Sequence, residues 1–258
     1  MATIEAKAFL IDLDGVLYVD NSPIEGAVET VEMLEEKGYR YRFVSNTTSK
    51  SRRRLAEFLE EMGFSISERR IFTPGIAAAE RIRSEKDKRC FLLTRPDLQE
   101  EFDQAGIPIA DDEAEYVVVG DAEDGFTFER LNRAFRLVMA GARIMALEKD
   151  RYWMGASGLS LSAGPFVAAL EYATGAVAEV VGKPSRDFFE MALAEMGASA
   201  QETAMIGDDI ITDVAGAKKL EMMGILVKTG KYREDLADHS TVVPDMIIES
   251  ISELREHI

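Results

Sequence analysis

The sequence has little of the nucleophilic and metal-binding chemistry that many enzymes use. It contains one cysteine, Cys90, and two histidines, His239 and His257. A single cysteine allows no disulfide and no thiolate zinc site within one chain, and its apolar neighbours indicate a buried strand residue. Two histidines are too few for a histidine metal cluster. A Ser-His-Asp triad would have to use one of these two residues, and both lie close to the C-terminus. The chemistry must therefore come from Asp, Lys, Ser, Thr and Asn.

Positive charge and long apolar runs are also scarce. The 258 residues include 30 Lys and Arg against 47 Asp and Glu, which gives a net charge of −17. The negative electrostatic field of such a chain opposes binding to nucleic acid. The one tight basic run, 50–54, begins an amphipathic helix pattern and is better explained as a solvated helix face. We find neither a signal-peptide apolar region nor an uncharged apolar stretch long enough to span a membrane. We therefore expect a soluble cytoplasmic protein with no nucleic-acid and no membrane partner.

Apolar runs alternate with amphipathic segments along the whole chain. This alternation predicts an α/β fold built on a parallel sheet. The predicted strands are Ala8–Leu13, Tyr41–Ser45, Cys90–Thr94, Tyr116–Val119, Arg143–Leu147, Ala178–Val181, Thr203–Ile206 and Met223–Val227. The predicted helices are Ala27–Glu36, Arg52–Met62, Phe128–Met139, Phe188–Met196 and Asp213–Leu220.

Polar residues come immediately after several of these strands. This position is informative because ligands of parallel sheets bind at the carboxyl ends of the strands. The clusters are Asp12-Leu13-Asp14-Gly15, Ser45-Asn46-Thr47-Thr48, Gly182-Lys183-Pro184-Ser185, Gly207-Asp208-Asp209 and Lys228-Thr229-Gly230-Lys231. They lie in the first fifth of the chain or after residue 180. We therefore expect a discontinuous core domain, residues 1–76 and 179–258, interrupted by an inserted α/β domain, residues 77–178. Thr73-Pro74-Gly75 is the expected break near the first junction.

Each cluster also has an ordinary structural interpretation. Asp-Gly is a common turn, an acidic loop with a capping aspartate is unremarkable in an acidic protein, and a lone lysine is usually a surface residue. Together, however, they resemble a phosphoryl-transfer site without histidine. Carboxylates suit Mg²⁺, one aspartate can attack phosphorus, and Lys, hydroxyl and amide donors can stabilise the phosphoryl oxygens.

The four motifs resemble those of the haloacid dehalogenase-like (HAD) phosphatases. They are Asp12-Leu13-Asp14-Gly15-Val16, Val44-Ser45-Asn46, Gly182-Lys183-Pro184 and the run 207–213. Their order and spacing are similar to the NagD-like branch, in which a cap is inserted between the second and third motifs. The cap segments 158–166 and 169–172 are similar to phospholysine/phosphohistidine/inorganic pyrophosphate phosphatase-like members. The resemblance covers essentially the whole chain and implies a Rossmann-like parallel-sheet core.

The resemblance also implies residue roles. Asp12 would be the nucleophile and a Mg²⁺ ligand, and Asp14 the general acid/base that also binds Mg²⁺ through its backbone carbonyl. Asp208 would be the third metal ligand. Phosphate binding would fall to Ser45, Asn46 and Lys183, with Asp209, Asp213 and Gly15 in support. Many relatives carry a second Asn where this chain has Thr47.

The expected function is a Mg²⁺-dependent phosphatase that hydrolyses small phosphorylated metabolites through an aspartyl-phosphate. Two alternatives stay open: a phosphotransferase or mutase with the same intermediate, and a receiver-like phosphate-binding module that is not an enzyme. Receiver modules need no general acid beside the phosphorylated aspartate, so Asp14 favours an enzyme. Capped relatives often pair through the cap, so a homodimer is compatible with the resemblance.

Overall fold

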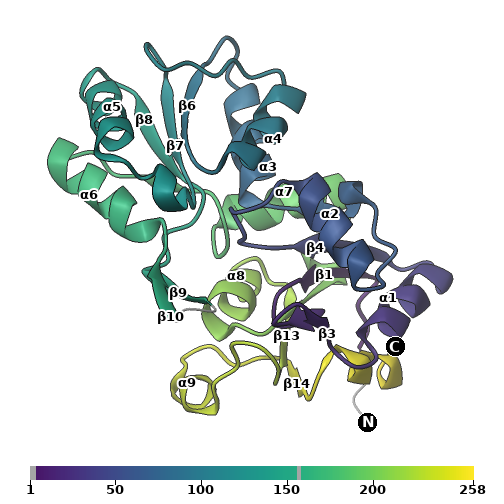
Figure 1. Ribbon diagram of the computed structural model, residues 1–258. Coiled ribbons are helices and arrows are strands. Elements are labelled where there is room, and N and C mark those ends of the chain that lie inside the picture. The colour runs from purple at the N-terminus through teal and green to yellow at the C-terminus, as the bar shows by residue number, and fades with distance from the viewer. Residues whose placement is uncertain (1–3, 156–157) are drawn as a thin grey trace. The chain divides into compact units, whose positions relative to one another are not determined.

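The computed structural model describes residues 4–155 and 158–258, and its contacts divide the chain into two compact units. The core unit contains the chain up to Ser45, Arg54–Phe72 and Lys183–Ile258. The inserted unit contains Asn46–Arg53 and Thr73–Gly182. Each unit has its own parallel sheet, as Figure 1 shows. The predicted α/β fold with an inserted α/β domain is therefore confirmed.

The core unit is built on a six-stranded sheet in the order β14-β13-β12-β1-β4-β5, with every neighbouring pair parallel. Its strands are β1 (Ala8–Asp12), β4 (Arg40–Val44), β5 (Ile71–Phe72), β12 (Thr203–Gly207), β13 (Met223–Val227) and β14 (Met246–Ile248), and a small hairpin joins β2 (Tyr18–Val19) to β3 (Ser22–Pro23). Its helices are α1 (Ala27–Glu36), α2 (Arg52–Glu61), η1 (Glu68–Arg70), α7 (Arg186–Met196), η4 (Ala200–Glu202), η5 (Ile210–Val214), α8 (Ala215–Lys218), α9 (Glu234–His239) and η6 (Ile251–Glu256). The first two residues of α2 group with the inserted unit.

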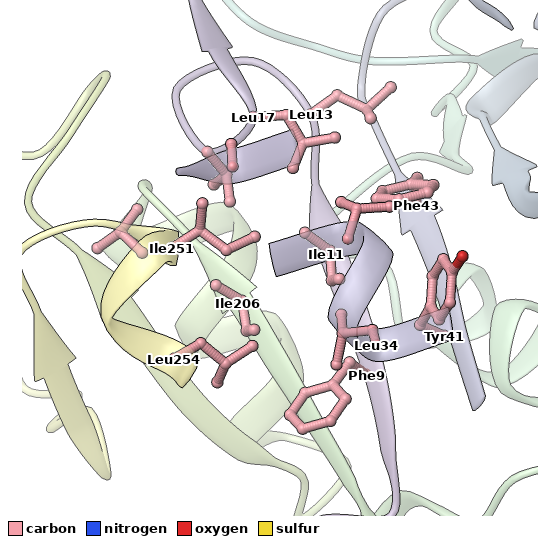
Figure 2. Close-up of a cluster of buried hydrophobic side chains, with 14 of the residues drawn as sticks. Phe9, Ile11, Leu13, Leu17, Leu34, Tyr41, Phe43, Ile206, Ile251 and Leu254 are labelled. Carbon is pink, nitrogen blue, oxygen red and sulfur yellow. The ribbon is translucent and has the colours of Figure 1, made fainter. Parts of the chain in front are cut away.

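The centre of the core sheet is covered on both faces. On one face Phe9 and Ile11 of β1 pack with Leu34 of α1 and with Ile251 and Leu254 of η6 (Figure 2). On the other face α7 contacts β4 and α8 contacts β13. A strand buried on both faces has no reason to alternate polar and apolar residues, which explains the continuous apolar run of β1. Each fully buried large side chain contributes about 1.5–3 kcal/mol, so this layer fixes the strand ends in place.

The inserted unit has a four-stranded parallel sheet in the order β11-β8-β7-β6 and a separate hairpin of β9 and β10. Helices α5 and α6 lie on one side of the sheet, and α3 and α4 lie on the other (Figure 1). The elements are α3 (Pro74–Arg83), β6 (Cys90–Leu93), η2 (Pro96–Leu98), α4 (Gln99–Gln104), β7 (Tyr116–Val119), η3 (Glu123–Gly125), α5 (Phe128–Met139), β8 (Arg143–Ala146), β9 (Tyr152–Gly155), β10 (Gly158–Leu161), α6 (Gly164–Thr174) and β11 (Glu179–Val180).

Two elements differ from the sequence prediction because of side-chain capping. The helix predicted over Asp213–Leu220 begins earlier, as the π-helix η5, because the Asp209 carboxylate accepts the N–H groups of Ile211 and Thr212. The sequence predicts a break between elements at Thr73-Pro74-Gly75, whereas in the structure this tripeptide begins α3. Thr73 caps that helix and Pro74 occupies its first turn, where its missing N–H costs nothing.

The strand predicted over Ala178–Val181 is present as β11, but it pairs with β8 in the inserted sheet. In this division residues 73–76 and 179–182, which we expected in the core, group with the inserted unit, as does the segment 46–53. An apolar run reveals that a strand exists and says little about its partner. The predicted domain limits otherwise stay a prediction. Among the described residues no helix has the length and apolar character needed to cross a membrane.

Candidate active site

Strand register brings three predicted site residues to one edge of the core sheet. Asp12, the last residue of β1, is opposite Val44 of β4, so Ser45 comes one residue beyond that pair. On the other side Ile11 is opposite Ile206 of β12, and Asp208 follows two residues later. Because all three strands are parallel, their carboxyl ends meet at the same edge. Asp12, Ser45 and Asp208 are all buried there, at 8%, 4% and 2% exposure.

A buried lysine joins two of the aspartates. The ammonium of Lys183 lies 2.8 Å from Asp12 Oδ1 and 2.7 Å from Asp213 Oδ1. Its side chain is 2% exposed, and Asp213 is fully buried. Burial alone would lower the pKa of Lys183, but the charges of Asp12 and Asp213 outweigh it and raise that pKa. Lys183 therefore stays charged and ties the third motif to the end of β1.

Two glycines make room for the Asp208 carboxylate. A Cβ at Gly15 would stand 1.9 Å from Asp208 Oδ2, and one at Gly230 would stand 2.1 Å from the same atom. Both glycines also have positive φ, +85° and +60°, which other residues rarely adopt. The backbone N–H of Lys231 donates to Asp208 Oδ2 at 2.6 Å. The backbone at Gly15 and Gly230 therefore packs closely against the Asp208 carboxylate, and a side chain at either position would prevent this contact.

The three carboxylates of the site outnumber its two nearby ammonium groups, those of Lys183 and Lys231. Asp12, Asp208 and Asp213 offer carboxylate oxygens that lie within 4.8 Å of one another. At that separation one carboxylate pair repels by about 3.5 kcal/mol with an effective dielectric of ~20. Burial, and then the charge of Asp12, raise the pKa of Asp208 to about 8 and that of Asp213 to about 7. For Asp213 the ion pair with Lys183 opposes this rise.

The residues present fit a divalent cation such as Mg²⁺. Asp208 Oδ1 is buried and accepts no hydrogen bond from the described residues, so a desolvated oxygen stands ready for a ligand. The three carboxylates outnumber the ammonium groups of Lys183 and Lys231, and hard cations prefer carboxylate oxygens. Asp12 and Asp208 are the residues that would hold the ion. Asp213 is already engaged with Lys183 and with the backbone N–H of Asp209, so it supports the site.

The remaining predicted residues fall into different places. Asp14 is exposed and follows the end of β1, and Gly15 donates its N–H to the carbonyl of Tyr18 in the turn. Asp209 is half-buried and caps η5. Asn46 belongs to the inserted unit, one peptide bond beyond Ser45. The catalytic and metal-binding roles given to these residues stay predictions.

The sequence prediction did not assign a role to Lys231 or Thr229. Desolvation opposes the charge on Lys231, but Asp12 and Asp208 outweigh it and raise its pKa. The Thr229 hydroxyl donates to the backbone carbonyl of Gly15 and fastens the turn after β1. Both residues belong to the polar cluster that follows the strand Met223–Val227. That position at the end of β13 was the signal available in the sequence.

Comparisons with known proteins agree with this geometry. The Haloacid dehalogenase-like hydrolase family pattern matches residues 9–108, and a HAD-hydrolase-like pattern matches residues 180–254. The chain is 43% identical to Haloacid dehalogenase-like hydrolase domain-containing protein 2 of Bos taurus, over 100% of this chain and 98% of that protein. It is 38% identical to Phospholysine phosphohistidine inorganic pyrophosphate phosphatase of Xenopus laevis, over 95% of this chain and 92% of the relative.

Solved structures extend the similarity to the fold of the whole chain. A p-nitrophenyl phosphatase from Archaeoglobus fulgidus superposes with a TM-score of 0.92 at 34% identity and covers 98% of this chain and 100% of its own. NagD from E. coli K-12 superposes with a TM-score of 0.89 at 28% identity and covers 98% of both chains. The chain therefore belongs to the haloacid dehalogenase-like hydrolases, in their NagD-like branch.

Proposed function

We propose that the protein is a Mg²⁺-dependent phosphatase of small phosphate monoesters, with Asp12 as its nucleophile. The observation that carries the proposal is the buried contact of Asp12 with Lys183 at 2.8 Å, beside the uncompensated oxygen of Asp208. The Lys183 ammonium therefore lies beside the carboxylate that would attack, where it can also stabilise the phosphoryl oxygens. Two similar proteins, a p-nitrophenyl phosphatase and a phospholysine phosphohistidine inorganic pyrophosphate phosphatase, are named for the same class of reaction and support the proposal.

In the proposed reaction a carboxylate oxygen of Asp12 forms a bond to phosphorus while the bond from phosphorus to the ester oxygen breaks. The departing alkoxide takes a proton from Asp14 and leaves as an alcohol. Asp14 then accepts a proton from water as the water oxygen attacks phosphorus, which frees Asp12 and releases inorganic phosphate. An exposed carboxyl at position 14 suits this role, since it must exchange protons with leaving group and water.

Positive charge and hydrogen-bond donors would bind the phosphoryl oxygens. Lys183 supplies a fixed charge beside Asp12, the Ser45 hydroxyl lies at the end of the adjacent strand β4, and Asn46 would supply its side-chain amide. Such donors act most strongly where charge develops in the transition state. When bound by Asp12 and Asp208, Mg²⁺ would supply further charge neutralisation.

The direct test is p-nitrophenyl phosphate turnover by the wild type and by Asp12→Asn. The substitution keeps the shape and removes the attacking charge, so we expect kcat to fall on the order of 10⁴-fold or more. Asp87→Asn is the matched control, because this exposed aspartate lies in a turn after α3, has a positive φ that asparagine also adopts, and has no proposed role. Full activity in Asp12→Asn would contradict the nucleophile assignment.

The reaction products separate hydrolysis from the two alternatives. With a competing alcohol present, a phosphatase releases inorganic phosphate, whereas a phosphotransferase forms the new phosphate ester in proportion to alcohol. A receiver-like module would accumulate a long-lived phosphoaspartate with no steady-state turnover. We expect release of inorganic phosphate both with and without the competing alcohol. EDTA should abolish this release and added Mg²⁺ should restore it.

A further inference from the structure

Within the inserted unit, the side chain of Asn46 lies directly against the backbone of Gly182. A Cβ placed on Gly182 would stand 2.8 Å from Asn46 Oδ1 and 2.4 Å from the carbonyl oxygen of Leu147. Real Cβ atoms are essentially never found closer than 3.0 Å to such neighbours. The backbone of Gly182 does not have the positive φ that favours glycine. The reason for a glycine at this position is therefore the space that Asn46 and Leu147 occupy.

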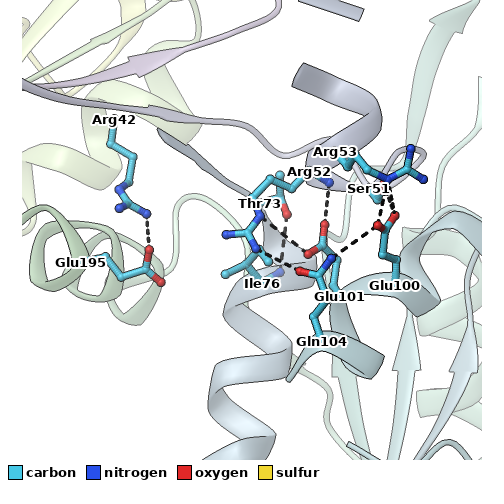
Figure 3. A network of polar contacts seen from close by, with 10 residues as sticks. All are labelled: Arg42, Ser51, Arg52, Arg53, Thr73, Ile76, Glu100, Glu101, Gln104 and Glu195. Atoms are coloured by element: carbon cyan, nitrogen blue, oxygen red, sulfur yellow. Dashed lines mark hydrogen bonds and ion pairs between the residues drawn. The ribbon is translucent and has the colours of Figure 1, made fainter. Parts of the chain in front are cut away.

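The segment that carries Asn46 is fastened to the rest of the inserted unit by polar contacts. The buried hydroxyl of Thr48 accepts the backbone N–H of Asp121 at 2.8 Å. Farther along, the backbone N–H of Arg52 donates to the carboxylate of Glu101 at 2.5 Å, and Glu101 is only 3% exposed. Figure 3 shows how Glu100 adds contacts to this same stretch. These contacts anchor the chain from two residues after Asn46 onward.

We propose that Gly182 and Thr48 are positioning residues for Asn46. The missing side chain at position 182 leaves a slot for the Asn46 amide, and the Thr48 hydrogen bond fixes the chain two residues further on. Together they hold the amide in one place, and the role proposed for that amide is to bind a phosphoryl oxygen. This inference rests on the proposed function, because it gives Asn46 the phosphate-binding role assumed there.

The size of the expected effect follows from the geometry. The Cβ of an alanine at position 182 would lie 2.8 Å from Asn46 Oδ1, whereas ordinary van der Waals contact begins at 3.4 Å. The Asn46 amide would therefore have to move away until ordinary contact is restored. The Leu147 carbonyl is backbone and yields less readily than a side chain. A misplacement of about 1 Å at a site that binds the reacting group costs up to about 100-fold in rate. We expect Gly182→Ala to lower kcat/KM for p-nitrophenyl phosphate by roughly 10- to 100-fold.

A double-mutant cycle tests whether Gly182 acts through Asn46. Kinetics are measured for Asn46→Ala, Gly182→Ala and the variant with both changes. If Gly182 positions the amide, the loss in the double variant is no larger than the loss in Asn46→Ala, because the amide is already absent. Losses that multiply would overturn the proposal and indicate that Gly182 acts through Lys183 or Leu147. Gly75→Ala is the control, since its Cβ would meet nothing closer than 3.5 Å.

Thr48 provides a second variant that does not add bulk. Thr48→Val removes the acceptor for the Asp121 N–H and should lower kcat/KM, while Thr48→Ser keeps a hydroxyl and should restore most of it. Equal losses in the two variants would mean that packing, and not the hydrogen bond, matters there.

The side-chain amide resonance of Asn46 separates this inference from the proposed function. It is assigned by its disappearance in Asn46→Ala and then followed in Gly182→Ala and Thr48→Val. We expect it to shift or broaden in both, and to stay in place in Gly75→Ala. An unchanged resonance would overturn the positioning role whatever the activity. A shifted resonance with no kinetic effect of Asn46→Ala would instead contradict the phosphate-binding role.

Discussion

Replacing the buried lysine of the site should destabilise the metal-free protein strongly. In Lys183→Met the aliphatic stem is kept, but Asp12 and Asp213 lose an ammonium at 2.8 and 2.7 Å. Removing one partner of a buried ion pair costs about 3–5 kcal/mol, because the remaining charge stays buried without compensation. We expect a loss of that size in the free energy of unfolding, measured by urea denaturation at about pH 8.5 in EDTA.

The loss should shrink at low pH, and the sign follows from the carboxylates. Asp213 already has its pKa raised to about 7, and removal of Lys183 raises it further above its value in the unfolded chain. A carboxyl with a raised folded pKa contributes stability that is present at low pH and lost as the pH rises through that pKa. One pKa unit is worth about 1.4 kcal/mol, so at about pH 5.5 the loss should be smaller by at least about 1 kcal/mol.

An exposed ion pair is the control for this variant. Lys228 Nζ lies 2.7 Å from Glu249 Oε1, with side chains 40% and 75% exposed. Exposed ion pairs contribute little to stability, so Lys228→Met should change the free energy of unfolding far less than Lys183→Met does. A loss in Lys183→Met as small as in the control, or one equal at the two pH values, would refute the account of a charge-balanced buried cluster.

Three further predictions follow from the same structure. In EDTA the wild-type free energy of unfolding should fall as the pH rises through the raised pKa values of Asp213, about 7, and Asp208, about 8. Added Mg²⁺ should make this fall smaller. Identical pH profiles with and without Mg²⁺ would count against the metal site. Gly15→Ala should abolish Mg²⁺ binding in calorimetry, because its Cβ would overlap Asp208, whereas Gly38→Ala, with similar φ and nothing within 4 Å, should bind normally. Burial raises the pKa of Cys90 to about 12, so this thiol should resist thiol reagents at about pH 8 until the protein is unfolded, and rapid labelling of the native protein would contradict its burial.

The sequence predicted the sheet well because buried parallel strands are continuous apolar runs. Tyr116–Val119 and Met223–Val227 have the predicted bounds, and so do helices Ala27–Glu36 and Phe128–Met139. Pairing was harder to predict. The strand at 179–180 is short and half-buried, and nothing in its composition shows that its neighbour is β8.

Polar residues at strand ends predicted the members of the site, since parallel strands end at one edge. Contacts across long sequence separations could not be predicted in the same way. The approach of Gly15 and Gly230 to Asp208 depends on three loops that meet only in the folded chain. The pairing of Lys183 with Asp213 likewise depends on how η5 begins, and a side-chain cap decides that.

The central claim is that Asp12 attacks phosphorus, and trapping the phosphoenzyme tests it most directly. The wild type is quenched in acid during turnover of p-nitrophenyl phosphate with Mg²⁺, digested, and examined by mass spectrometry. We predict that the peptide containing Asp12 gains the mass of one phosphoryl group, and that this species is absent from Asp12→Asn. A phosphoryl group on any other residue, or active turnover with no phosphorylated Asp12 peptide at any quench time, would contradict the account.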